Sequence, residues 1–142
     1  MTMTGDPLLD RHLMRKNYIR AESEIALKLN KNTSLSYSFT SPMDADSDPL
    51  HFELDISDTI DFTNLLVHEK TYISTTNWYM FTGTQFENLL STGMDAGYHR
   101  NIVTYIIPSG VLTRGVEYYI RYRATDDGGT TFSGYRSDIK TW

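Results

Sequence analysis

The sequence contains no cysteine, which excludes a disulfide scaffold, a cysteine-ligated zinc site and a thiol nucleophile. Proline is also scarce, with four in 142 residues, whereas tyrosine occurs ten times and phenylalanine six times. This balance is typical of a folded β-rich domain whose stability comes from packing. The length predicts one domain with enough chain to bury a core.

An excess of positive charge is absent as well, because 18 acidic side chains outnumber 13 basic ones and the net charge is −5. That balance argues against a nucleic-acid-binding protein that works by neutralising phosphates. No segment holds an apolar run long enough for a secretion signal or a membrane span. We therefore expect a protein that is assembled in the cytoplasm and has neither nucleic acid nor a membrane as a partner.

Basic side chains gather near the N-terminus and acidic ones in the body of the chain. Four basic residues and no acidic one lie from position 11 to position 20, whereas residues 32–69 contain no lysine or arginine. A run of acidic side chains follows between positions 44 and 61. The molecule is therefore expected to be electrically lopsided.

Residues 1–22 lack the alternation of a strand and are predicted to form an N-terminal arm. Asp6 and Pro7 are suited to begin a short helix, the aspartate as cap and the proline in the first turn. Two interpretations stay open, a frayed terminus or a segment that docks on a partner subunit. The partner-binding candidates are Leu8, Leu9, Leu13 and Met14 on an apolar face, and the cations Arg11, Arg15 and Lys16.

Residues 23–142 are predicted to form a single all-β domain, because apolar and polar residues alternate along most of it. The segment 85–90 fits either one helical turn or a packed loop, and a turn at 126–129 predicts a hairpin. About seven short strands without a core helix indicate a sandwich or barrel. Strands are predicted at residues 24–29, 35–39, 50–56, 70–74, 77–81, 102–107, 118–124 and 132–139.

The segment Leu112-Thr-Arg-Gly115-Val-Glu-Tyr118 resembles the E–F corner of the fibronectin type III family. The leucine, the glycine and the tyrosine keep the family's spacing, although Arg114 stands where proline is usual. The resemblance implies that Tyr118 buries its ring and returns its hydroxyl to the backbone of the crossing loop. It implies an immunoglobulin-like or fibronectin type III-like β-sandwich with an N-terminal extension. In such a sandwich the segment 57–100 is longer than a minimal member of the family needs between the same strands.

The same resemblance makes the strands at 50–56 and 118–124 neighbours. Outward Glu53 and Asp55 would then face outward Arg121 and Arg123 on the solvent side of the sheet. Cross-strand ion pairs are expected, each worth about 0.2–1 kcal/mol if exposed.

A calcium site is the nearest match to a metal motif. Asp44, Asp46 and Asp48 have the spacing of calcium-loop carboxylates, and Asp55 falls at the twelfth position. Pro49, however, occupies the place that requires glycine for the sharp turn. We therefore expect a turn that caps its own amides, with no metal or other cofactor.

Catalytic motifs are missing from the sequence. The four histidines are scattered, and neither a nucleophile elbow nor a phosphate-binding glycine loop occurs. An enzyme is therefore not expected.

Two apolar or aromatic stretches are candidate contact surfaces. Tyr119, Arg121 and Arg123 form a stripe that could stack sugars, or an ordinary strand surface neutralised by nearby acids. Residues 78–81 are large and apolar on both faces, so they are either core or a contact between subunits through Trp78 and Tyr79.

The combination of an adhesion-type sandwich, a cysteine-free chain and an apolar, basic arm resembles accessory proteins of tailed bacteriophages. It implies a non-enzymatic structural protein of the virion, assembled in the host cytoplasm, such as a capsid decoration or head/tail accessory protein. The arm would anchor it to other virion proteins, such as the major capsid or tail proteins, and a homo-oligomer is expected. The alternatives are a carbohydrate-binding or host-adhesion module and an intracellular partner-binding domain.

Overall fold

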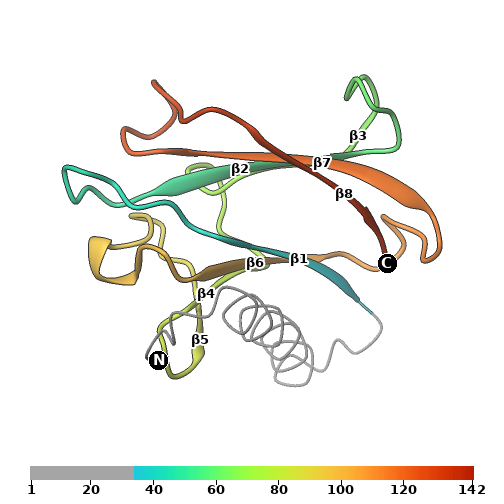
Figure 1. Cartoon of the computed structure of the whole chain (residues 1–142). Helices are drawn as coiled ribbons and strands as arrows, with labels where there is room; N and C mark the ends of the chain where they lie inside the picture. Colours follow the sequence, from blue (N-terminus) through green and yellow to red (C-terminus); the bar gives the residue numbers. More distant parts are fainter. Residues whose placement is uncertain (1–33) are drawn as a thin grey trace, which may run out of the picture.

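Two four-stranded antiparallel sheets pack face to face over residues 34–142, the part of the chain that the computed structural model describes (Figure 1). This confirms the all-β sandwich. The predicted strand 24–29 and the arm lie outside the described residues. The first sheet has the order β1–β6–β4–β5 and consists of β1 (Leu35–Thr40), β6 (Ile102–Ile107), β4 (Trp78–Phe81) and β5 (Phe86–Asn88). The second has the order β3–β2–β7–β8 and consists of β3 (Leu65–Lys70), β2 (His51–Ser57), β7 (Glu117–Thr125) and β8 (Arg136–Thr141).

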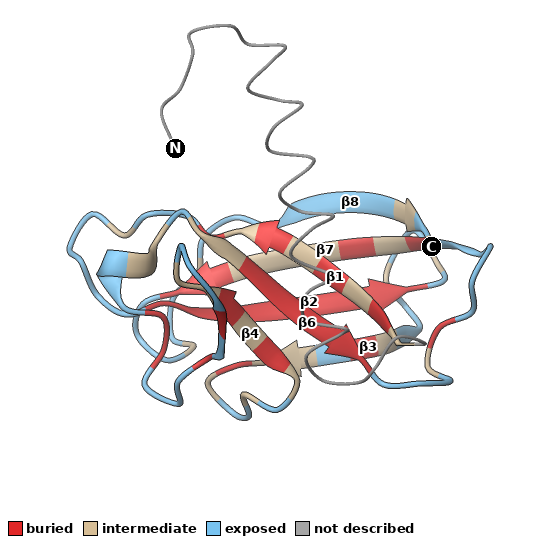
Figure 2. Ribbon diagram, turned by 90° about the horizontal axis from the view of Figure 1, so that it is seen from below, coloured by how far each residue is buried: buried red, intermediate tan, exposed pale blue. Residues whose placement is uncertain are grey.

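Alternating residues of each sheet fill the space between the two. On β1, Leu35, Tyr37 and Phe39 are buried while the serines between them are half-buried. Phe39 stacks on Tyr122 of β7, with ring centroids 4.3 Å apart, and so joins the two sheets. Figure 2 shows that β2 and β6, in the interior of their sheets, are coloured mainly as buried, whereas most loops are exposed. Each fully buried large apolar side chain contributes about 1.5–3 kcal/mol.

Tyr118 closes one end of the sandwich. Its ring is buried, and its hydroxyl accepts a hydrogen bond of 2.9 Å from the backbone N–H of Thr113. Leu112 is buried beside it in the same core. Gly115 adopts a φ of 81°, which only glycine tolerates readily, and its N–H donates to the carbonyl of Trp142. The loop from β6 is thus tied to both β7 and the end of the chain.

The segment between residues 57 and 100 contains β3, β4, β5 and a single 3₁₀ turn, Ala96–Tyr98. The predicted strand at 70–74 is wrong. The strand lies at Leu65–Lys70, and the amides of Ile73 and Ser74 both donate to the carbonyl of Lys70, which makes a turn. Because β3 is an edge strand with an exposed face, its alternation is weak in the sequence.

Two other predicted boundaries also differ. Residues 86–88 form the short strand β5, which pairs with β4, and not a helical turn. The last strand begins at Arg136 and not at residue 132, because the carboxylate of Asp127 accepts hydrogen bonds from the amides of Thr130 and Thr131 and holds that segment in a loop.

Of the two roles predicted for Trp78, the structure shows the one in the core. It is fully buried in the core beside Tyr105, since it points inward on β4. Tyr79 points the other way and packs in a smaller apolar cluster with Phe86 and Ile106. Within residues 34–142, no helix is long and apolar enough to cross a membrane.

Candidate functional site

The outer face of the β3–β2–β7–β8 sheet carries two ion pairs between β2 and β7. Asp55 contacts Arg121 at 2.9 Å, and Glu53 contacts Arg123 at 3.1 Å. The register places each carboxylate directly opposite its arginine, so the predicted pairing is confirmed. The prediction of exposure is wrong, because Glu53 and Asp55 are 4% and 2% exposed.

Each buried carboxylate has a second hydrogen-bond partner on the side of β3. Asp55 is bonded to Nδ1 of His68, and Glu53 accepts from the hydroxyl of Tyr72. The pKa of Tyr72 is raised to about 12, first because the hydroxyl is desolvated and then because it donates to Glu53. Two donors from opposite sides thus satisfy each buried acid.

Aromatic rings cover the two guanidinium groups. Phe62 and Tyr135 lie over Arg121, with ring centroids 4.4 and 4.7 Å from its guanidinium carbon. Phe132 and Tyr135 lie over Arg123 at 3.7 and 4.5 Å. These rings come from loops, and they explain why the ion pairs are shielded from water.

The predicted ligand stripe is therefore divided in the structure. Arg121 and Arg123 are held between carboxylates and rings, whereas the hydroxyl of Tyr119 donates to Glu117 of its own strand at 3.3 Å. The geometry supplies no open row of cations beside Tyr119.

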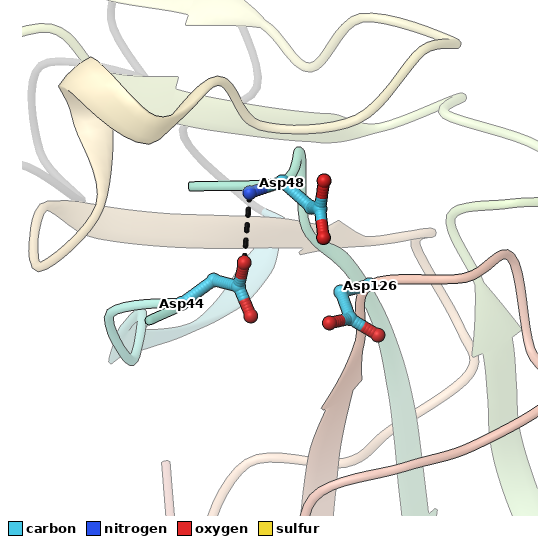
Figure 3. Close-up of side chains that lie close together, drawn as sticks. All are labelled: Asp44, Asp48 and Asp126. Atoms are coloured by element: carbon cyan, nitrogen blue, oxygen red, sulfur yellow. Dashed lines mark hydrogen bonds between the residues drawn. The ribbon is translucent and has the colours of Figure 1, made fainter. Parts of the chain in front are cut away.

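A second feature is an acidic cluster at the end of the sandwich where the β1–β2 and β7–β8 loops meet. Carboxylate oxygens of Asp44, Asp48 and Asp126 lie within 4.8 Å of one another (Figure 3). The amide of Asp48 donates to Asp44 Oδ2 at 2.7 Å, as expected for a turn that caps itself. Asp46 is not part of this cluster.

The acidic cluster gathers negative charge at close range. Burial raises the pKa of Asp126, and its hydrogen bond and repulsion with Asp44 raise that pKa further. The pKa of neighbouring Asp127 is instead lowered, chiefly by the hydrogen bond from the side chain of Thr131. A divalent ion or a lysine or arginine side chain has the charge to occupy the cluster.

The three histidines in the described residues all serve the fold. His51 is buried with Nδ1 2.9 Å from the hydroxyl of Thr71, and its burial lowers its pKa. Nδ1 of His99 accepts from the amide of Asp44, which leaves Nε2 to donate to the carbonyl of Met94. His68 holds Asp55, as described above.

An open cleft of about 810 Å³ runs between β1 of one sheet and β7–β8 of the other. Its walls carry aromatic side chains, including Tyr37 and Tyr122. The hydroxyl of Tyr37 crosses to β8, where it donates to Asp138 at 3.0 Å. The two sheets are therefore joined at this side by a polar contact.

The arm candidates Leu8, Leu9, Leu13, Met14, Arg11, Arg15 and Lys16 lie outside the described residues. Asp126 is the residue that sequence reasoning missed, because its approach to Asp44 depends on how the two loops are brought together.

Comparison with protein-family models, with curated proteins and with solved structures gave no significant match.

Proposed function

We propose that this chain is a non-enzymatic structural protein of a bacteriophage particle, a capsid decoration or a head/tail accessory protein. The acidic cluster is the observation that carries the proposal. Its three carboxylates converge at one end of the sandwich, whereas the carboxylates of Glu53 and Asp55 are paired with arginines. A basic protein surface would relieve that repulsion, so this end is suited to meet a basic neighbour.

The sandwich belongs, in this proposal, to the fibronectin type III-like domains. The order β3–β2–β7–β8 and the buried Tyr118 bonded to the preceding loop support that assignment. Such a domain would serve as a rigid surface module, and residues 1–22 would anchor it to a major capsid or tail protein.

Carbohydrate binding or host adhesion is the weaker candidate. The charges of Arg121 and Arg123 are already compensated by Asp55 and Glu53, and their faces are occupied by rings. A sugar at this face would have to displace those contacts.

Co-sedimentation tests the proposal. Phage particles purified from the strain that carries the coding sequence are mixed with the full chain, with a chain lacking residues 1–22, and with a variant in which Asp44, Asp48 and Asp126 are all asparagine. We expect the full chain to sediment with the particles. The truncated chain should stay in the supernatant, and the triple variant should bind more weakly.

An Asp46→Asn variant is the matched control, because Asp46 lies in the same loop but outside the acidic cluster. It should bind like the full chain. Sedimentation of the truncated chain with the particles, or the absence of the full chain from them, would contradict the proposal.

A further inference from the structure

Strand β8 ends its sheet with an exposed edge. Among the described residues it pairs with β7 alone, and five of its six residues are exposed. Figure 2 shows it along the rim of the molecule, coloured mainly as exposed. Ile139, at its middle, is 58% exposed. An edge strand of this kind is a template on which another strand can pair.

The hydrogen-bond pattern shows which backbone groups of β8 face outward. The carbonyl of Phe52 accepts a hydrogen bond from the amide of Thr71. The backbone N–H and C=O groups of the even-numbered residues of β2 therefore face β3, and those of the odd-numbered residues face β7. By the same alternation, the even-numbered residues of β7 direct their backbone groups to the even-numbered residues of β8. The backbone N–H and C=O groups of Ile139 therefore point away from the sheet. The amide of Ile139 agrees, since it donates to the side chain of Asp138 at 2.9 Å.

The charges along β8 favour one way of pairing it with a second copy of itself. In an antiparallel pair with Ile139 opposite Ile139, Asp138 lies opposite Lys140 of the second copy, and this happens twice. A shift that places Asp138 opposite itself also places Arg136 opposite Lys140, so it joins only like charges. Opposite charges across a strand pair stabilise it and like charges destabilise it. The outward backbone groups of Ile139 are compatible with this register, because they lie opposite the same outward groups of the second copy.

We propose that two copies of this chain join through β8, antiparallel about a two-fold axis at Ile139, to form one continuous eight-stranded sheet. The amide of Ile139 exchanges the carboxylate of Asp138 for the carbonyl of Ile139 in the second copy. The released oxygen of Asp138 then faces the ammonium of Lys140 in the second copy. The other carboxylate oxygen keeps its bond to Tyr37.

The β8 pairing would be one interface of the homo-oligomer expected for the proposed function. Only its biological role rests on that function, because the dimer itself does not require a phage particle. The contact is measured on the isolated full chain, without phage particles. A monomeric chain that still sediments with particles would therefore overturn the dimer alone.

Charge exchange tests the register. Full-length Asp138→Lys and Lys140→Asp variants each place like charges opposite one another, and we expect the dissociation constant to rise about tenfold or more. The double variant exchanges the two charges and should restore dimerisation. An equimolar mixture of the two single variants should form heterodimers, because each supplies the charge that the other needs.

The measurement is sedimentation velocity over a series from micromolar to near-millimolar chain, with thermal unfolding to establish that each variant is folded. Glu87→Lys on β5 makes the same charge change on the edge of the other sheet and should leave the dimer unchanged. A chain that stays monomeric throughout the series overturns the proposal. So does a dimer that neither single charge variant weakens.

Cross-linking tests the two-fold axis directly in this cysteine-free chain. Ile139→Cys should be joined to its copy by a short bis-methanethiosulfonate reagent, because the two side chains lie opposite each other. Ser137→Cys is the matched control, since antiparallel pairing places it about 13 Å from its copy. Equal cross-linking at both positions would rule out this register.

Discussion

Single residues in this sandwich combine an apolar and a polar role. Tyr118 places its ring in the core while its hydroxyl accepts from the Thr113 amide, so one side chain joins a strand to a loop. This role could be predicted from sequence, because the leucine, the glycine and the tyrosine lie within seven residues of one another. Asp126 could not be placed in the same way, since its neighbour Asp44 belongs to a distant loop.

Removing the Tyr118 hydroxyl tests its contribution. Tyr118→Phe keeps the ring but leaves the Thr113 amide without this acceptor, so we expect the free energy of unfolding to fall by about 1 kcal/mol. Urea unfolding measures the difference. Tyr119→Phe is the control, because that hydroxyl is bonded only at the surface of β7. An equal loss in both variants would show that the corner hydrogen bond has no special weight.

His51 makes the stability depend on pH. Burial lowers its pKa below the ordinary 6.5, so the unfolded chain binds a proton more readily than the folded one as the pH falls below that value. The folded state is therefore expected to lose stability in this window, and His51→Gln should flatten that part of the profile. Thermal melts between neutral pH and pH 5 measure it. A steeper or unchanged slope in the variant would contradict the assignment.

At the scale of elements, β2 departs most from its sequence pattern. Its alternation predicts one polar face in water, yet every residue from His51 to Ser57 is buried. The reason lies in Phe62, Tyr72 and Phe132, which reach over the outer face from loops. Neighbouring strands could be predicted from the resemblance at the corner, but the loops could not, because their paths depend on tertiary contacts.

A double-mutant cycle measures the coupling of β2 to β7. Arg121→Met leaves the buried carboxylate of Asp55 with one partner fewer, and we expect a loss of about 2–4 kcal/mol in unfolding free energy. The double variant with Asp55→Leu should lose less than the sum of the single losses, with a coupling of about 1–3 kcal/mol. Arg114→Met, at an exposed loop position, should change stability by less than about 0.5 kcal/mol. Additive losses would show that Asp55 and Arg121 contribute to stability independently of each other.

At the scale of the whole molecule, the density of acidic residues in the sequence does not show where their charges lie in the fold. The acidic segment from residue 44 to residue 61 divides into two parts in the structure. Asp44 and Asp48 join Asp126 at one end, whereas Glu53 and Asp55 are buried against arginines. A count of charges along the sequence does not predict which acidic residues gather in a cluster and which are buried in ion pairs, because burial depends on which strands become neighbours.

The connectivity also sets the order in which the molecule can be made. Each sheet depends on a late strand, since β1 pairs with β6 and β2 with β7. At ordinary rates of translation, β1 waits ~3–12 s for its neighbour to leave the ribosome, roughly 60 residues later. Neither sheet can therefore be assembled strand by strand in the order of the sequence. The nascent chain must carry both apolar faces open until β6 and β7 have been synthesised, and then complete the two layers almost together.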